Sequence, residues 1–318
     1  MYSLVNSRFC LGSFELSHRL IQGPLAGFSC APFRQMFSHF TPPAYSVSEM
    51  LSANDVIHKH TSNGRYLYRG LGEKNLCYQI SGSEPSIMAE AALKLENLGA
   101  DLLDINCGCP KTKIRKKGAG SALLESEQNL IAIIASVRAA IKCPLTVKVR
   151  LQGNDHDIEL AKRIADAGVD ALIVHGRRWM DDYDVPCDLA KIAKIKRALH
   201  IPVIANGDIT DRSTLENIHA QTGCDAFMIS RASTGKPWLF QALLSGSNIT
   251  LEITERVALF MRHLHGLAQL ENEYQAVLQS KSLVRYYFRE QLTPAFLQDF
   301  YKLTHLQDIE SILLKQWT

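Results

Sequence analysis

The sequence predicts an α/β fold in which short buried strands alternate with helices, followed by a smaller all-helical domain. Its 318 residues are 46% hydrophobic and 21% charged, which is enough apolar material for a sizeable core. Short apolar runs recur through the first part of the chain and are separated by helix-like stretches. After residue 245 the strand signal stops and only helical spacing remains.

Eight apolar runs are short enough to be buried strands rather than helices. They span residues 20–23, 44–48, 76–80, 102–106, 145–149, 171–175, 202–205 and 226–229. Continuous apolar strands that alternate with helices are typical of a parallel sheet covered on both faces. Eight such units suit a TIM (β/α)8 barrel better than an open doubly wound sheet.

A weak internal repeat marks several strand entries. Gly99, Gly168 and Gly223 each follow a helix-like stretch and begin a Gly-x-Asp triplet that leads into an apolar run. Glycine commonly ends a helix, so the repeat predicts helix, turn and buried strand in that order. Pro144 and Pro202 stand just before two further runs, where proline is tolerated as a strand begins.

The C-terminal part is predicted to be a helical domain, 249–318, after a barrel domain, 1–245. Thr254–Glu271 and Glu273–Leu292 carry apolar residues at helical spacing. Lys281, Arg285 and Arg289 would then form one stripe four residues apart, either contacting phosphates or simply facing solvent.

Charge and cysteine content exclude several classes of protein. The net charge of +3 is too small to argue for nucleic-acid binding without clustering. No apolar run is long enough to span a membrane, and the first residues do not resemble a signal peptide. The eight cysteines include no C-x-x-C pair, so we expect reduced thiols in a cytoplasmic protein without a structural metal.

The active site of such a barrel lies at the carboxyl ends of its strands, and here nearly every strand ends in a polar residue. The loops after the seventh and eighth strands often bind phosphate. In this chain they are Asn206-Gly207-Asp208 and Ser230-Arg231, and Lys148 ends the fifth strand nearby. Gly207 allows close backbone approach and Arg231 can pair with an anion, so we expect a phosphate-bearing cofactor.

Two cysteines follow the fourth strand. Cys107 is predicted to be a small buried apolar residue, as most single cysteines are. Cys109 comes just before Pro110, in a loop that we expect to be tight and to lie at the barrel mouth. Cys109 is therefore the better candidate for a reactive group.

Basic residues cluster directly after this loop. They are Lys111, Lys113, Arg115, Lys116 and Lys117. Such a run is usually a solvated face, but this one and Arg177-Arg178 share the mouth with the predicted site. An anionic macromolecule would be steered there.

In combination these motifs resemble the bacterial tRNA-dihydrouridine synthases. The matching segments are Gly23-Pro24-Leu25-Ala26-Gly27, Ser48-Glu49-Met50, Asp104-Ile105-Asn106-Cys107-Gly108-Cys109-Pro110, Lys148-Val149-Arg150, His175-Gly176-Arg177 and Ala205-Asn206-Gly207-Asp208-Ile209. The resemblance implies an FMN-dependent TIM-barrel enzyme that uses NADPH to reduce uridines of tRNA, with a helical domain for tRNA recognition.

The resemblance also implies roles for single residues. FMN would be held by Pro24, Leu25, Ala26, Gln79, Lys148, His175, Asn206, Gly207, Asp208, Ser230 and Arg231. Cys109 would be the catalytic acid and Asn106 would help to place the uracil. Lys111, Lys113, Arg177, Lys281 and Arg285 are then expected to contact tRNA. We expect a monomer.

Three positions depart from the family pattern. Ser230 replaces a usual glycine and could crowd the cofactor phosphate, Arg178 replaces a usual threonine, and Leu25 replaces methionine. Two alternatives stay open: an FMN barrel acting on a free pyrimidine, similar to dihydroorotate dehydrogenases, and a tRNA-binding protein without activity. The sequence does not indicate which tRNA position is modified.

Overall fold

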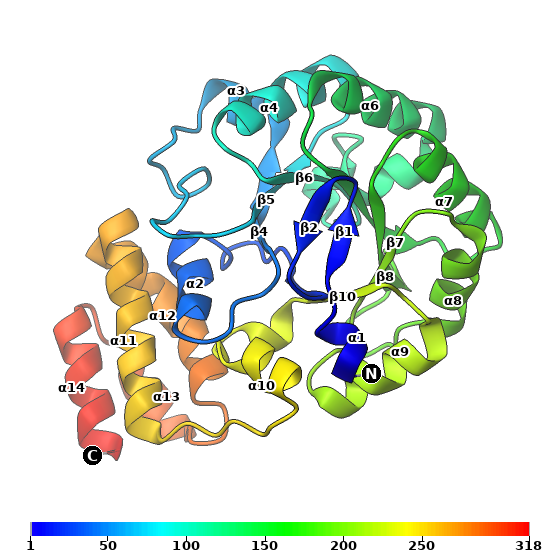
Figure 1. Ribbon diagram of the computed structural model, residues 1–318. Coiled ribbons are helices and arrows are strands. Elements are labelled where there is room, and N and C mark those ends of the chain that lie inside the picture. The colour runs from blue at the N-terminus through cyan, green and yellow to red at the C-terminus, as the bar shows by residue number, and fades with distance from the viewer. Residues whose placement is uncertain (1, 318) are drawn as a thin grey trace.

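The computed structural model describes residues 2–317 and contains a closed barrel of eight parallel strands (Figure 1). These are β3 (Leu20–Gln22), β4 (Ser46–Ser52), β5 (Leu76–Ser81), β6 (Leu102–Cys107), β7 (Leu145–Leu151), β8 (Ala171–Arg178), β9 (Val203–Asn206) and β10 (Ala226–Ile229). Each strand pairs with the next along the chain, and β10 pairs with β3 to close the ring. The eight predicted strands are confirmed, although β4, β7 and β8 end two to four residues later than the apolar runs indicated, and β4 begins two residues later.

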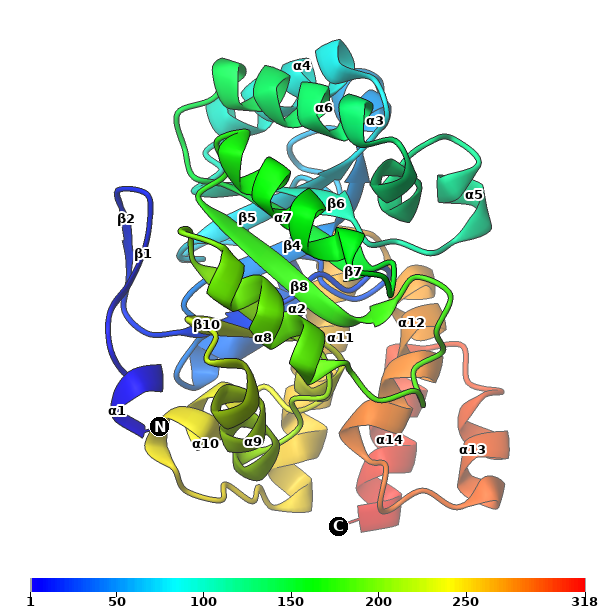
Figure 2. The same cartoon turned by 90° about the vertical axis from the view of Figure 1, so that its right-hand side faces the viewer.

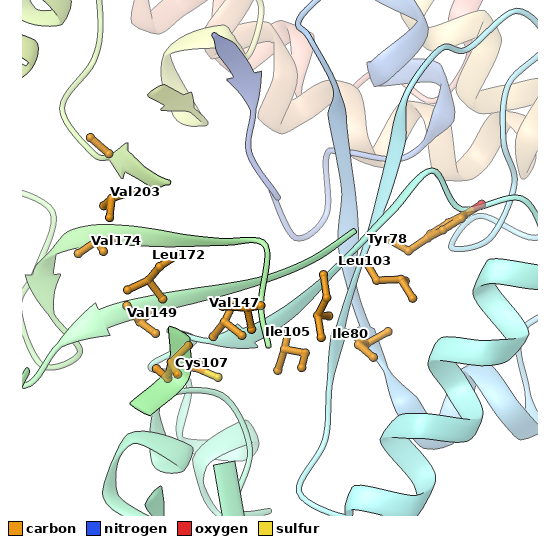
Figure 3. Close-up of a cluster of buried hydrophobic side chains, with 14 of the residues drawn as sticks. Tyr78, Ile80, Leu103, Ile105, Cys107, Val147, Val149, Leu172, Val174 and Val203 are labelled. Carbon is orange, nitrogen blue, oxygen red and sulfur yellow. The ribbon is translucent and has the colours of Figure 1, made fainter. Parts of the chain in front are cut away.

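Helices surround the barrel and most of them cover the outer face of its strands, whereas the short α5 projects at the carboxyl end (Figures 1 and 2). They are α2 (Ala31–Gln35), α3 (Ala53–His58), α4 (Pro85–Asn97), α5 (Thr112–Arg115), α6 (Glu127–Ala140), α7 (His156–Asp166), α8 (Leu189–Ala198), α9 (Arg212–Thr222) and α10 (Leu239–Ser245), with 3-10 turns at Met36–His39, Gly120–Glu125 and Arg231–Ser233. Outward-facing strand residues such as Ile80, Ile105 and Val147 are fully buried in this layer (Figure 3). Apolar residues on both faces explain why the strands appear as continuous runs.

The Gly-x-Asp repeat has a structural role that its spacing did not reveal. In each triplet the glycine has a positive φ, at 89°, 97° and 63° for Gly99, Gly168 and Gly223. The aspartate then accepts a hydrogen bond from the first N–H of the preceding strand: Asp101 from Leu76 at 2.8 Å, Asp170 from Leu145 at 2.8 Å and Asp225 from Val203 at 2.7 Å. The repeat therefore ties the amino ends of neighbouring strands together.

A β-hairpin that the sequence did not predict closes the opposite end of the barrel from the site. It consists of β1 (Phe9–Leu11) and β2 (Phe14–Leu16) and follows the short α1 (Tyr2–Val5). Leu11 and Leu16 are fully buried and pack with residues at the starts of the barrel strands. Figure 1 shows the hairpin lying across the barrel opening, and Figure 2 shows it beside the sheet.

The C-terminal helices form a second hydrophobic cluster beside the barrel. They are α11 (Ile253–Leu270), α12 (Glu273–Tyr287), α13 (Pro294–Phe300) and α14 (Leu306–Trp317), centred on Phe260, Phe288 and Phe300. The helix predicted over Glu273–Leu292 ends earlier, at Tyr287, so Arg289 does not continue the stripe of Lys281 and Arg285. The reason is that Phe288 turns into the core, where it stacks on Trp317.

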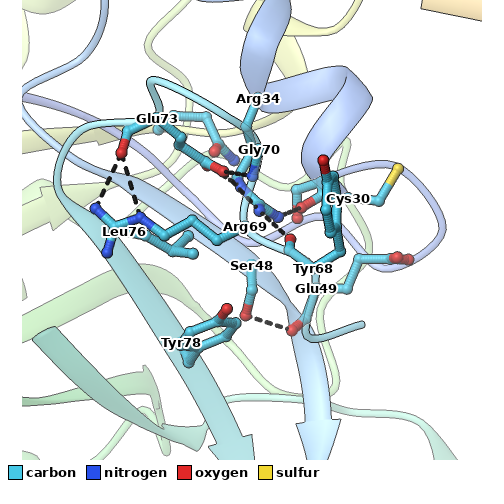
Figure 4. A network of polar contacts seen from close by, with 12 residues as sticks. Cys30, Arg34, Ser48, Glu49, Tyr68, Arg69, Gly70, Glu73, Leu76 and Tyr78 are labelled. Carbon is cyan, nitrogen blue, oxygen red and sulfur yellow. Dashed lines mark hydrogen bonds and ion pairs between the residues drawn. The ribbon is translucent and has the colours of Figure 1, made fainter. Parts of the chain in front are cut away.

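A buried ion pair fixes the long connection between α3 and β5. Arg34 of α2 pairs with Glu73, and its other nitrogens donate to the carbonyls of Ser29 at 2.7 Å and Tyr68 at 3.1 Å (Figure 4). Because both charged groups are almost fully buried, this connection has a defined path over the barrel rim. Within residues 2–317 no helix is both long and apolar enough to cross a membrane.

Candidate active site

The inward-facing residues change from apolar to polar along the barrel axis. Near the strand starts they are residues such as Cys77, Leu102 and Ala171. Two or four positions later on the same strands, the same inward face carries polar side chains because successive residues alternate between faces. These are Gln79, Asp104, Asn106, Lys148, His175 and Asn206, all of which are buried or half-buried. The carboxyl end of the barrel is therefore lined by polar side chains, and these six residues are called the cup below.

A chain of hydrogen bonds crosses three strands and ends at the Cys109 loop. Thr146 donates to the carboxylate of Asp104 at 2.6 Å, and the Gln79 amide donates to its other oxygen at 2.7 Å. Asn106 donates to the Gln79 carbonyl oxygen at 2.8 Å. The Asn106 oxygen in turn accepts from the backbone N–H of Cys109 at 2.9 Å. Gln79 and Asn106 thus position the cysteine loop from below.

The Cys109 loop is also held from above. Ser121 donates to the Cys109 carbonyl through its backbone N–H at 3.1 Å and its hydroxyl at 3.0 Å. Gly120 has φ 62°, and a Cβ there would lie 2.8 Å from the same carbonyl oxygen. Cys109 is half-exposed and free, whereas Cys107 is fully buried in the layer under the helices. The different environments agree with the distinction drawn from the sequence.

Lys148 is an unpaired cation in the cup. Its ammonium has no hydrogen-bond or ion-pair partner among residues 2–317, and burial lowers its pKa below the usual lysine range despite the attraction of Asp104. Burial likewise raises the pKa of Asp104. A half-buried ammonium without a partner is costly, so this position favours an anionic ligand.

His175 lies in a strongly positive environment. Burial, followed by the charges of Lys148, Arg150, Arg177 and Arg231, lowers its pKa to about 2, which favours the neutral imidazole. A neutral imidazole can donate or accept a hydrogen bond without adding charge. The surrounding cations therefore define an anion-attracting side of the cup.

The loop after β9 brings backbone close to His175. Gly207 has φ 114°, and a Cβ there would lie 2.4 Å from the Cys187 sulfur and 3.1 Å from the His175 ring. Asp208 also has a positive φ, 55°, and its carboxylate accepts from Arg177 at 2.7 Å and from the Cys187 N–H at 3.0 Å. Asn206 donates to the Met228 carbonyl at 2.8 Å. Only glycine leaves this approach open.

Arg177 does not lie on the surface. It is 3% exposed, and besides Asp208 it donates to the carbonyls of Tyr183 at 2.8 Å and of Val185. All of these partners come from the loop after β8 or from the β9 turn. The structure therefore corrects the expectation that Arg177 contacts tRNA: its donors are used inside the protein.

The Ser230 side chain occupies the space that a side chain at Gly23 would need. A Cβ on Gly23 would lie 2.3 Å from the Ser230 hydroxyl oxygen, so the serine side chain is turned toward the end of β3. Pro24 and Leu25 are half-buried in the turn that follows, and Ala26 is exposed at its tip. The turn is anchored at Gly27, whose N–H donates to Glu49.

The remaining predicted basic contacts lie on two separate surfaces. Lys111 and Lys113 are exposed at α5, while the neighbouring Arg115 stacks over Trp179 at 3.7 Å from the ring centroid. On α12, Lys281 is half-exposed, and Arg285 donates to the Tyr301 hydroxyl at 2.6 Å.

Arg231, at the β10 end, lies 3.8 Å from the centroid of the exposed Tyr183 ring. Sequence reasoning did not identify Tyr183, and nothing in its local sequence marks it. Asp104 was quoted in a motif but given no role, although its spacing of two from Asn106 places both on one face.

The cup fits a phosphate-bearing cofactor on its own residues. It offers an ammonium without a hydrogen-bond partner, a histidine among cations, a glycine turn packed closely against that histidine, and Gln22, whose buried amide oxygen has no hydrogen-bond partner in the described chain. Within the same residues no group of three or more His, Cys, Asp or Glu side chains could hold a metal ion.

Comparison with known proteins identifies close relatives. The family model described as dihydrouridine synthase matches residues 21–313. The chain is 36% identical over 290 residues to tRNA-dihydrouridine synthase B of Vibrio parahaemolyticus, covering 88% of this chain and 89% of the relative. It is 35% identical over 286 residues to tRNA-dihydrouridine synthase B of Pseudomonas aeruginosa, covering 87% and 86%.

Solved structures share the fold at low sequence identity. Morphinone reductase superimposes with a TM-score of 0.56 at 11% identity, covering 79% of this chain and 92% of that one. A 2-naphthoyl-CoA reductase complex gives 0.58 at 14% identity, covering 78% of this chain, which spans about half (53%) of that protein. These matches bear on the barrel alone. The match of the family model over most of the chain shows that this protein belongs to the dihydrouridine synthase family.

Proposed function

We propose that this protein is a cytoplasmic, FMN-dependent enzyme that uses NADPH to reduce the C5–C6 double bond of specific uridines in tRNA. The observation that carries the proposal is the hydrogen-bonded chain from Asp104 through Gln79 and Asn106 to the Cys109 loop, beside an unpartnered Lys148. It supports a positioned thiol facing an anion-binding cofactor cup. Family membership and the tRNA-dihydrouridine synthase B relatives support the substrate.

The cofactor would be held by the residues of the cup. The phosphate and the ring edge of the cofactor would be bound by Lys148, by the backbone of Asn206-Gly207-Asp208 and by Ser230-Arg231. The rest of the cofactor site would be lined by Pro24, Leu25, Ala26, Gln79 and His175. A bound FMN, once reduced by NADPH, would supply the hydride that adds to C6 of the uracil.

Cys109 would supply the second hydrogen. Its thiol donates a proton to C5 on the face opposite the hydride, so the base gains a hydride and a proton and the sulfur is left as a thiolate that solvent reprotonates. The Asn106 amide oxygen accepts a hydrogen bond from the backbone N–H of Cys109, which restrains the loop that carries the thiol. One N–H of the Asn106 amide is still free to meet a uracil edge, as only its bond to Gln79 is formed in residues 2–317.

A base inside folded tRNA cannot reach this cup, so the target uridine must be flipped into it. The exposed lysines of α5, Lys111 and Lys113, and the α12 residues Lys281 and Arg285 are proposed to contact the RNA backbone. The C-terminal helical domain, 249–318, would orient the tRNA relative to the barrel domain, 1–245. We propose that the enzyme acts as a monomer.

The test is to incubate the purified, flavin-loaded protein with NADPH and folded tRNA lacking dihydrouridine, then to map products by nuclease digestion and mass spectrometry. We expect a mass gain of two hydrogens at a defined uridine. A protein that leaves the tRNA unchanged but oxidises or reduces a free pyrimidine would transfer the assignment to the dihydroorotate dehydrogenase-like alternative. A colourless protein that binds tRNA without product would indicate the non-enzymatic alternative.

A further inference from the structure

The barrel and the C-terminal helices meet at a seam where two backbones touch. Gly235, in the loop after β10, has φ 69°, and a Cβ there would lie 2.5 Å from the Tyr286 carbonyl carbon and 2.7 Å from its oxygen. On the same side, Phe28 packs edge-on against the Tyr286 ring with centroids 5.6 Å apart. Because the backbone of Gly235 lies directly against the backbone of Tyr286, a residue with a Cβ does not fit at position 235. The barrel and the helices are therefore closely packed at this seam.

A cavity of about 180 Å³ opens at this seam. Its cations come from both sides: Arg231 and Lys236 from the barrel loop, Arg256 from α11, and Arg289 from just beyond α12. Glu290 is the one acidic residue that lines it. These four cations come from three separate segments of the sequence, which is why no basic run indicated the site.

None of the four cations forms an ion pair with another residue of the described chain, 2–317. Arg256 lies 5.5 Å from the centroid of the Trp238 ring, and its Nε is buried without a hydrogen-bond partner. Arg231 only stacks on Tyr183. Like charges gathered around so small a volume repel one another, and an anion bound between them would relieve that repulsion and satisfy the Arg256 donor.

We propose that this cavity is a preformed phosphate site that binds one backbone phosphate of the tRNA substrate. The choice of tRNA as the source rests on the proposed function. The volume suits a phosphate group with a few waters, since each water occupies about 30 Å³, and is too small for a nucleotide. Its walls belong both to the loop after β10 at the barrel mouth and to the helical domain, so an RNA strand bound there contacts both.

The cofactor phosphate is the competing source, because Arg231 belongs to the loop proposed to hold FMN. The experiment therefore uses the cations that lie outside that loop's turn. Arg289→Gln removes an exposed charge, Arg256→Gln removes the buried donor, and the double variant combines them. The matched control is Arg197→Gln: Arg197 is exposed, has no ion pair within residues 2–317, and ends α8 at the opposite rim of the barrel.

Each full-length, flavin-loaded variant is titrated with tRNA across a range of KCl concentrations, and its apoprotein is titrated with FMN by flavin fluorescence. We expect each seam substitution to raise the Kd for tRNA about tenfold and to lower the slope of log Kd against log[KCl] by about one. The Kd for FMN and the Arg197→Gln variant should both stay at wild-type values. Thermal unfolding tests whether Arg256→Gln is folded. If this variant is unfolded, the tRNA affinity of Arg289→Gln alone decides the test.

The outcomes separate this site from the proposed function. If the seam variants bind tRNA as tightly as wild type while the wild type forms dihydrouridine, the phosphate site is refuted and the function stands. If FMN affinity falls and tRNA affinity does not, the cavity serves the cofactor and the proposal is refuted. If wild type binds tRNA with the expected seam dependence but makes no dihydrouridine, the site is supported and the function fails.

Discussion

At the scale of single residues, the environment of Cys109 distinguishes it from the seven other cysteines. Its backbone N–H and carbonyl are both held, by Asn106 and Ser121, while its side chain stays half-exposed at the cup. Cys107, two residues earlier, points to the opposite face of β6, where burial raises its pKa far above the usual thiol range. One thiol is presented to a substrate and the other is inert packing.

Cys109→Ala should retain the fold and FMN but lose at least 100-fold in the rate of dihydrouridine formation, because the proton donor to C5 is removed. Single-turnover assays of the flavin-loaded variant measure this rate. Cys107→Ala is the control and should stay within a few-fold of wild type. An active Cys109→Ala enzyme would rule out the proposed acid.

Gly23 and Ser230 should behave as a coupled pair. Gly23→Ala places a Cβ against the Ser230 hydroxyl oxygen, so it should lower the free energy of unfolding by about 1–3 kcal/mol. Ser230→Gly on the same background removes that clash and should restore part of the loss. Urea denaturation of the two single variants and the double variant measures the coupling, and additive effects would contradict it.

The charge on Lys148 should make FMN binding sensitive to alkaline pH. Burial lowers the pKa of this ammonium, so it deprotonates before an ordinary lysine with its pKa of about 10.4. The protonated ammonium attracts the phosphate. The Kd for FMN should therefore rise as the pH increases from neutral toward the ordinary lysine pKa. Fluorescence titrations across this range test it, with Lys148→Met as the reference whose pH dependence should be flat.

At the scale of elements, Arg65 joins the barrel to the C-terminal helices. It donates to Glu49 of β4 at 2.8 Å, to Gln279 of α12 at 3.0 Å and to the Gly27 carbonyl at 3.1 Å, and it pairs with Glu271 between α11 and α12. Gln279 also donates to the Gly27 carbonyl at 2.9 Å. The turn proposed to contact FMN is thereby tied to the helices proposed to bind tRNA.

Arg65→Gln should lower the free energy of unfolding by about 2–4 kcal/mol, because Glu49 is 4% exposed in its side chain and would be left as a buried charge. The comparison is Arg8→Gln, which breaks the exposed Arg8–Glu15 pair and should change stability by less than about 0.5 kcal/mol. Denaturant titrations measure both. Equal effects would mean that the Arg65 network contributes nothing beyond a surface pair.

At the scale of the whole molecule, the two ends of the barrel have separate tasks. The hairpin β1–β2 seals the amino end with fully buried Leu11 and Leu16, and the polar cup occupies the carboxyl end. Different residues therefore stabilise one end and carry the proposed chemistry at the other, as in barrel enzymes generally.

Leu16→Ala should cost about 2–5 kcal/mol of folding free energy, because it leaves a cavity under the hairpin. The rate of dihydrouridine formation per folded molecule should not change. Urea denaturation and assays well below the unfolding temperature check the two statements. Leu71→Ala, at a side chain that is 96% exposed, is the control and should be neutral. A loss of turnover in folded Leu16→Ala would show that the ends are coupled.

The sequence alone determined the barrel and the identity of most cup residues. Strands and turns are encoded locally, in apolar runs of four or five residues and in the Gly-x-Asp triplets, so they can be predicted without knowledge of the fold. Once eight strands are recognised, the rule that chemistry lies at their carboxyl ends places Lys148, His175 and Cys109 together.

Only the tertiary structure decided what each side chain contacts, because those contacts join distant residues. Arg177 was expected to contact tRNA, but its guanidinium is buried and donates to Asp208 and to the Tyr183 carbonyl. The hairpin was missed because three-residue strands leave too short a pattern, and it is stabilised by packing on the barrel. The cationic cavity at the Gly235–Tyr286 contact exists only after barrel and helices pack together, since no local pattern records which separate segments will meet.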